Sequence, residues 1–174
     1  AHAMPLPVLE WLDSNGLADL GEADRNVVRI DPKVSGVRAG APLPLASSMT
    51  DPVLRLAEMD ATGVAIEAVS LPPFLLGSTS EDTEFVSELV RRGNDALEEY
   101  CAAAPDRLVA LSSLPVGTPD ALAEAQRCLE ERGARGVSIG SRGNGCELDD
   151  SVNSELWAYL AERRTFVFLH PSAT

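Results

Sequence analysis

The two histidines of this chain, His2 and His170, are the residues whose positions most strongly indicate chemistry. His170 follows the apolar run at residues 166–169 and precedes Pro171, which predicts a histidine at the carboxyl end of a short buried strand. In α/β barrels, catalytic and metal-binding side chains gather at that end of the strands. His2 lies at the opposite end of the sequence. The pair suggests half of a metal site; the alternatives are a hydrogen-bonded strand-end residue for His170 and a flexible terminus for His2.

A regular alternation of helices and short apolar strands begins at residue 51. Asp51-Pro52 is a typical N-cap with proline in the first helical turn, and Gly63 is a typical helix stop. Strands that alternate with helices predict a parallel sheet, which we expect to be covered on both faces. The predicted helices occupy residues 51–63, 81–104, 118–133 and 151–163, and the predicted strands residues 64–70, 108–114, 136–140 and 166–170.

The first fifty residues have a different pattern. Residues 6–12 could form a helix, and residues 27–30 and 34–38 could pair as a hairpin around Asp31-Pro32-Lys33. Residues 39–50 and, later in the chain, residues 141–149 are predicted to be loops.

Composition limits the class of protein. The chain has 174 residues, is 45% hydrophobic and carries a formal net charge of −13, so it can bury one core and is expected to repel nucleic acid and anionic lipid. No apolar run approaches the roughly 20 residues that span a bilayer, and no leader segment is recognised. A soluble protein without nucleic-acid or membrane partners is expected.

The three cysteines lack the close spacing of a zinc or redox motif. Cys101 and Cys128 fall on apolar helix faces and are interpreted as core residues, whereas Cys146 lies in a glycine-rich loop as a bystander thiol. Reduced cysteines favour a cytoplasmic location.

Four short motifs occur in order along the second part of the chain. They are Arg-Leu-Ala-Glu-Met-Asp-Ala-Thr-Gly-Val at residues 55–64 with Val-Ser-Leu-Pro at 69–72, Pro-Asp-Arg-Leu-Val-Ala-Leu at 105–111 with Leu114-Pro115, Arg-Gly-Val-Ser-Ile-Gly at 135–140, and Phe-Leu-His-Pro at 168–171. Together these motifs resemble the amidohydrolase-related family (amidohydrolase 2), which includes aminocarboxymuconate-semialdehyde decarboxylase. The resemblance covers residues 51–171 well and the first fifty poorly.

This resemblance implies a distorted TIM (β/α)8 barrel of the metal-dependent hydrolase type. Such a barrel needs about 250 residues, so residues 1–174 are expected to form its N-terminal portion, with a small insertion at about 25–50. The family holds one divalent metal, zinc foremost with manganese as the alternative. His2 resembles the second histidine of a His-x-His pair on the first strand, and His170 matches the ligand after the fifth. A further histidine and an aspartate are expected beyond residue 174, which leaves the catalytic residues unknown.

Three residues are candidates for substrate binding. Arg38 is a cation for a carboxylate, Phe74 follows the second barrel strand, and Asn144 lies in the loop after the strand at 136–140. The respective alternatives are a solvated arginine, core or lid packing, and an ordinary loop residue. The acidic cluster at residues 147–150 is interpreted as a solvated loop and helix cap.

The preferred function is a metal-dependent decarboxylase, a carbon–carbon lyase, acting on a small unsaturated or aromatic carboxylic acid, expected as a homodimer. One alternative is a metal-dependent hydrolase or hydratase on the same barrel, opening a lactone or cyclic amide. Another is a non-catalytic α/β binding domain that has lost the metal set. A doubly wound nucleotide-binding sheet is disfavoured because no glycine-rich turn follows a first strand.

Overall fold

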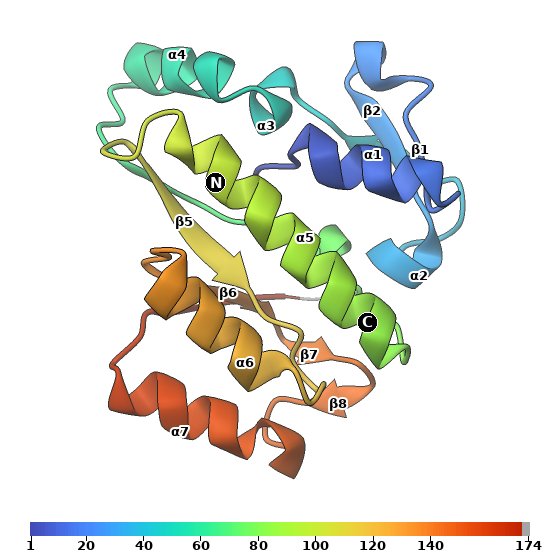
Figure 1. Cartoon of the computed structure of the whole chain (residues 1–174). Helices are drawn as coiled ribbons and strands as arrows, with labels where there is room; N and C mark the ends of the chain where they lie inside the picture. The colour runs from blue at the N-terminus through green and yellow to red at the C-terminus, as the bar shows by residue number, and fades with distance from the viewer. Residues whose placement is uncertain (172–174) are drawn as a thin grey trace.

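A curled parallel sheet forms the centre of the computed structural model, which describes residues 1–171 (Figure 1). Its strand order, β4-β5-β6-β9, follows the order along the chain. The N-terminal residues extend the same sheet through a parallel bridge between His2 and Ser70. This sequential parallel order is that of a (β/α)8 barrel, and the curl makes the sheet part of one. The strands are β4 (Glu67–Val69), β5 (Leu108–Ser113), β6 (Gly136–Gly140) and β9 (Val167–His170).

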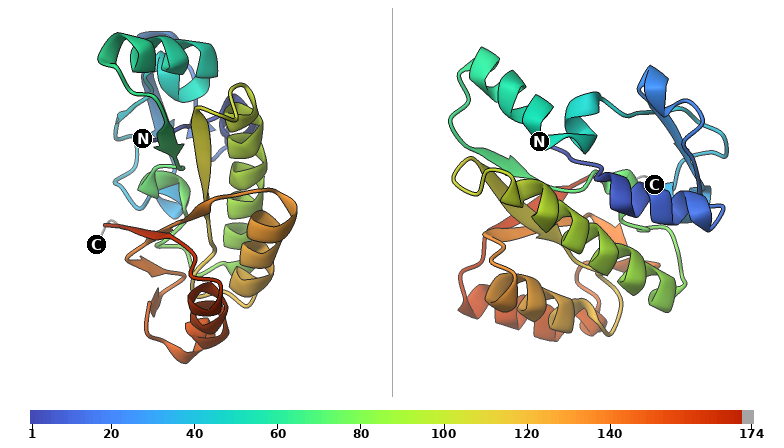
Figure 2. Two further views of the ribbon diagram at one scale, coloured as in Figure 1. Left: turned by 90° about the vertical axis from the view of Figure 1, so that its left-hand side faces the viewer. Right: turned by 45° about the horizontal axis from the view of Figure 1, so that its top comes forward.

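The helices that follow these strands lie on one side of the sheet (Figure 2). On β6, Val137 and Ile139 pack into one apolar cluster with Ala125 and Leu156 of the neighbouring helices. The prediction of a sheet covered on both faces is therefore wrong for the described residues, because these helices all lie on one face and the curl turns the other face inward. These helices are α5 (Thr83–Ala102), α6 (Ala121–Gln126), which continues as a π-helical segment (Arg127–Glu131), and α7 (Ser154–Glu162).

Helix α4 (Pro52–Thr62) confirms the capping signals in the sequence. The Asp51 side chain accepts hydrogen bonds from the backbone N–H groups of Val53 and Leu54, and Gly63 follows the last helical residue. Helix α4 is followed by β4. It is therefore the last helix of the long connection between the N-terminal segment and β4.

The insertion before α4 forms a small antiparallel sheet of order β1-β2-β3 beside α1 (Leu6–Ser14). The predicted strand at residues 34–38 is wrong, because this segment starts as α2 (Pro32–Ser35). Asp31 accepts a hydrogen bond from the Lys33 backbone N–H, and Gly36 ends the turn with a φ of 69°. The predicted loop at 39–50 also contains two short elements. The insertion comprises β1 (Ala18–Asp19), a 3-10 turn (Ala23–Arg25), β2 (Val27–Ile30), β3 (Leu43–Pro44) and α3 (Ser47–Thr50).

A two-residue hairpin replaces the predicted loop after β6. Strands β7 (Arg142–Gly143) and β8 (Cys146–Glu147) pair across Asn144 and Gly145, whose φ values are 49° and 73°. Asn-Gly is the sequence that favours this left-handed turn. Two 3-10 turns, η2 (Pro73–Leu75) and η4 (Ser151–Asn153), complete the described elements.

Strand β9 is exposed, whereas the sequence predicted a buried strand. Phe168 and Leu169 expose 43% and 53% of their surface. Within residues 1–171, β9 pairs with β6 alone. The apolar residues of β9 are therefore exposed because β9 is the edge strand of the sheet in the described part of the chain.

Burial confirms that Cys101 and Cys128 are core residues. Burial also raises the pKa of each thiol to about 12. Cys146 is partly exposed on β8. None of the helices in residues 1–171 combines the length and the apolar character that crossing a bilayer requires.

Candidate metal centre

His2 and His170 meet on the inner side of the curled sheet. Their ring centroids lie 5.1 Å apart, with the ring planes tilted by 51°. His2 is carried by the segment that pairs with β4, and His170 is the last residue of β9. Of the candidate site residues, His2 and His170 are the farthest apart in the sequence. The curl of the sheet brings these two together.

The His2 ring is held by Ser70, the residue that follows β4. Its Nδ1 lies 3.2 Å from Ser70 Oγ, and the backbone of the same segment pairs with Ser70 through bonds from Ala3 N to Ser70 O and from Ser70 N to Ala1 O, both 3.0 Å. Burial lowers the pKa of His2, and the nearby His170 ring acts in the same direction. A neutral imidazole is the form that binds metals.

The protonated nitrogen of His170 follows from its partner. His170 Nδ1 lies 2.9 Å from the carbonyl oxygen of Pro171. Because a carbonyl only accepts, Nδ1 is the nitrogen that carries the proton in the neutral ring, and Nε2 keeps its lone pair. The edge of Phe168 faces the same ring, with centroids 6.0 Å apart.

These two imidazoles fit a divalent transition-metal ion. In both rings Nδ1 is engaged by a protein group, which leaves Nε2 as the nitrogen for a metal bond. The ring centroids lie 5.1 Å apart, which is close enough for His2 and His170 to be ligands of one ion.

Further ligands are not assembled in the described part of the chain. Within residues 1–171, no group of three or more His, Cys, Asp or Glu side chains converges to hold a metal. The histidine pair is therefore the candidate contribution of residues 1–171 to a metal site. The additional histidine and aspartate implied by the resemblance stay a prediction.

The three predicted substrate-binding residues occupy different surroundings. Arg38 is exposed, Phe74 packs partly buried against the main core, and Asn144 donates from Nδ2 to the carbonyl of Gly117 at 3.1 Å. The Asn144 Oδ1 atom is buried and has no hydrogen-bond partner in the part of the chain that the structure describes. Within residues 1–171, none of the three makes a hydrogen bond to either histidine ring, so their roles stay predictions.

Two residues that contact His2 were not singled out from the sequence. Ser70 contacts the ring, and Arg55 donates from Nη2 to the His2 carbonyl oxygen at 2.7 Å. Both lie inside recognised motifs, but the motifs alone assign them no role. Only the position of Ser70 could have indicated a role. Ser70 lies at the carboxyl end of β4, just as His170 lies at the carboxyl end of β9.

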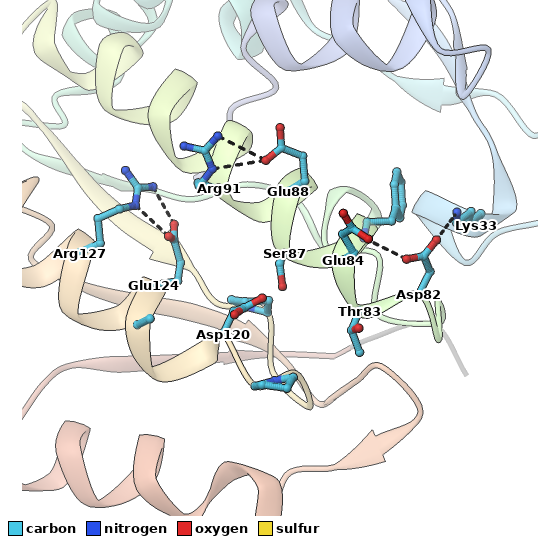
Figure 3. A pocket seen from close by; sticks show the side chains of 14 residues that line it. Lys33, Asp82, Thr83, Glu84, Ser87, Glu88, Arg91, Asp120, Glu124 and Arg127 are labelled. Carbon is cyan, nitrogen blue, oxygen red and sulfur yellow. Dashed lines mark hydrogen bonds and ion pairs between the residues drawn. The ribbon is translucent and has the colours of Figure 1, made fainter.

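A groove of about 890 Å³ lies elsewhere, between α5 and α6 (Figure 3). Its charged side chains largely pair with each other: Lys33 with Asp82 at 2.9 Å, and Arg127 with Glu124 at 2.8 Å. Neither histidine lines it. Because the groove is formed by the outer helices, it is distinct from the histidine pair on the inner side of the sheet.

A curled parallel sheet with paired imidazoles inside it defines the class of metal-dependent (β/α)8 barrels. The amidohydrolase family model matches residues 2–174, and the chain belongs to that family. A curated relative, 2-amino-3-carboxymuconate-6-semialdehyde decarboxylase of Dictyostelium discoideum, is 30% identical over 72% of this chain and 35% of its own length. The chain thus spans about a third of that relative.

Solved decarboxylase structures share the fold. A 2,6-dihydroxybenzoate decarboxylase complexed with 2,6-dihydroxybenzoate is 31% identical, with a TM-score of 0.62 over 67% of this chain and 38% of that chain. A 5-carboxyvanillate decarboxylase from Novosphingobium aromaticivorans, complexed with manganese and 4-hydroxy-3-methoxy-5-nitrobenzoic acid, is 26% identical. Its TM-score is 0.63 over 72% of this chain and 36% of that chain.

Proposed function

We propose that this chain supplies two metal ligands, His2 and His170, to a decarboxylase that cleaves a carbon–carbon bond of a small unsaturated or aromatic carboxylic acid. The observation that carries the proposal is the convergence of the two rings at 5.1 Å, each with its Nδ1 engaged. Similarity to decarboxylases of aromatic and semialdehyde acids supports the reaction class.

A divalent ion bound there supplies a Lewis acid that stabilises negative charge as carbon dioxide is lost. The chain's own residues have the task of orienting the substrate. Phe168 exposes 43% of its surface beside His170 and offers an apolar edge to a planar ring. Arg38, Phe74 and Asn144 remain our candidates for substrate contacts, with Arg38 as the cation for the carboxylate.

The identity of the metal is a finer part of the proposal. Imidazole is a good ligand for zinc, the metal that the family resemblance implies foremost. The manganese bound to the related 5-carboxyvanillate decarboxylase supports manganese as the alternative. Metal analysis of the purified full-length protein, expected to give about one divalent ion per chain, distinguishes the two.

Three further features complete the proposal. Residues 1–174 are the N-terminal portion of one barrel domain; the barrel order of the strands supports this. The buried, unpaired Cys101 and Cys128 fit a reducing cytoplasm. A homodimer is expected, and light scattering of the full-length protein measures it.

The reaction is tested with the metal-loaded full-length protein and a panel of hydroxybenzoic acids labelled with ¹³C in the carboxyl group. Release of ¹³CO₂ that stops on chelation of the metal is the expected result. Turnover of lactones or cyclic amides without any ¹³CO₂ would replace the decarboxylase with the hydrolase alternative. A metal-free protein with full activity would refute the metal site.

A further inference from the structure

Arg55 is a largely buried cation at the back of the histidine site. Its side chain is 12% exposed and extends from α4 to three other segments. Nη2 donates to the His2 carbonyl oxygen at 2.7 Å, and Nε donates to the Tyr100 hydroxyl of α5 at 3.3 Å. Nε also lies 3.6 Å from Oε2 of Glu67 on β4.

The segment that carries His2 pairs with β4 and Ser70 along one of its edges. The nitrogen of Ala1 bonds to Ala68 O at 2.7 Å, and a parallel bridge joins His2 and Ser70. In this bridge, Ala1 and Ala3 supply the backbone groups that bond to Ser70, so the carbonyl of His2 points away from β4. That carbonyl is the group that Arg55 binds. A charge-assisted hydrogen bond thus holds the main chain at the proposed metal ligand.

The partners of Arg55 are themselves held in place. The Tyr100 hydroxyl donates to the carbonyl oxygen of Ser48 at 2.6 Å and is buried. Glu67 lies on β4, and among residues 1–171 its Oε2 has no hydrogen-bond partner and one ion-pair partner, Arg55. The guanidinium therefore takes a fixed orientation from α5 and β4 and transmits it to the His2 backbone.

We propose that Arg55 is a positioning residue for the His2 ligand, acting through the main-chain carbonyl so that the ring faces His170. The inference rests on the proposed metal pair for its function, but the contact itself can be tested without metal. Lysine at this position keeps the charge and loses the planar fork that reaches His2 and Tyr100 together.

A matched control lies on the same part of the fold. Arg107 donates to the carbonyl oxygens of Ala65 and Val64 at 2.6 and 3.0 Å, in the turn after α4, and to Asp60 at 2.9 Å. Arg107→Lys thus removes comparable bonds to backbone carbonyls, but these bonds do not involve His2. Any loss caused by general weakening of the α4 region should appear in both variants.

The first measurement is manganese affinity of the full-length protein, by competition with a chelator. Arg55→Lys is expected to weaken binding about 10- to 100-fold, the range typical of outer residues that orient metal ligands. Arg107→Lys is expected to stay within about 2-fold of the parent. Equal affinity of the two variants would overturn the inference.

The second measurement uses ¹⁵N NMR of the histidine rings in the metal-free protein. His2 resonances are identified by their loss in His2→Gln. Arg55→Lys should change the His2 tautomer balance and ring shifts, whereas Arg107→Lys should leave them as in the parent. Unchanged His2 signals in Arg55→Lys would reject the positioning role.

A parent protein that binds no manganese or zinc but shows the expected NMR change would refute the proposed function and retain the Arg55–His2 contact. If Arg55→Lys does not fold, Tyr100→Phe replaces it, because it removes one tether of the guanidinium and keeps the ring. A change in the His2 signals of this variant supports the inference, and unchanged signals overturn it.

Discussion

His170 and His2 face each other at a centroid distance of 5.1 Å, although they belong to opposite margins of the five-segment sheet that runs from the N-terminal residues to β9. A flat sheet would hold these margins far apart, since neighbouring strands are about 4.8 Å apart. The contact is therefore a direct consequence of the curl. Any substitution that flattens the sheet should separate the rings before it unfolds the chain.

Replacement of His170 by alanine should abolish metal retention and leave the fold intact. The ring is only partly buried, and its one hydrogen bond in the described residues is to the adjacent Pro171. We expect a loss of metal affinity of more than about 100-fold and a change in unfolding free energy within about 0.5 kcal/mol. Phe168→Leu, on the same strand, is the control that should keep the metal. Unchanged metal content in His170→Ala, measured by elemental analysis, would remove it from the ligand set.

Removal of the Ser70 hydroxyl should weaken the metal site without large loss of stability. Ser70→Ala deletes the oxygen that lies 3.2 Å from His2 Nδ1, so the ring loses the contact that orients it. The expected effect on metal affinity is about 10-fold. Ser112→Ala, a buried serine on β5, is the control because Ser112 contacts neither histidine ring by a hydrogen bond in residues 1–171. Equal affinities by chelator competition would contradict the prediction.

Asn94 should be among the residues most sensitive to truncation. It is buried, accepts from Ser113 N at 2.8 Å, and donates to Ser113 O at 2.9 Å and to Glu124 at 2.7 Å. Asn94→Ala leaves these buried groups without partners and should cost roughly 2–4 kcal/mol of unfolding free energy. Urea denaturation measures the loss. Asn15→Ala, at an exposed helix end, should cost no more than about 1 kcal/mol, and similar losses in both variants would argue against the buried network.

The buried thiols predict a loss of stability in alkaline solution. The pKa of Cys101 and of Cys128 rises from 9.0 to about 12 in the folded chain. Between these values the unfolded chain binds fewer protons than the folded chain, so the unfolding free energy falls as pH rises from 9 to 12. At about pH 10 each thiol should account for about 1 kcal/mol.

Urea denaturation of the parent and of the double variant Cys101→Ala, Cys128→Ala, at about pH 7 and about pH 10, tests this prediction. The difference between the two pH values should be smaller in the variant, by about 2 kcal/mol. Parallel pH dependences would show that other groups are responsible. Native alkylation should modify Cys146 first, because it is the partly exposed cysteine.

Local signals predicted most of the helices and the barrel strands. Asp51-Pro52 and Gly63 bound α4 as expected, and β6 has the predicted limits. The same kind of signal at Asp31-Pro32 and Gly36 was interpreted as part of a hairpin, and the structure shows a helical turn. Asn144-Gly145 forms the tight turn of a hairpin that was predicted as a loop. In both cases the capping or turn chemistry was present in the sequence and was given too little weight.

The candidate site could be predicted only in part. The sequence indicated His2 and His170 because of their positions at strand ends, but their separation depends on the twist and packing of all intervening strands. The contacts of Ser70 and Arg55 with His2 join residues 68 and 53 positions apart. Such contacts have no local signature, since neither periodicity nor capping depends on them. The sequence predicted that β9 is buried because its residues are apolar. An apolar sequence does not show which neighbouring segments cover a strand, so the exposure of β9 could not be predicted.

The bridge between His2 and Ser70 closes a loop of 68 residues, which contains α1 to α4 and the small antiparallel sheet. The entropy of closing a loop grows only with the logarithm of its length, so ten additional residues cost roughly 0.1 kcal/mol. Gly40, exposed in a turn between β2 and β3, is a suitable place for them. The insertion beside Arg38 can therefore be lengthened or reshaped while the histidine pair is kept, which makes this loop the natural target for altering substrate preference by design.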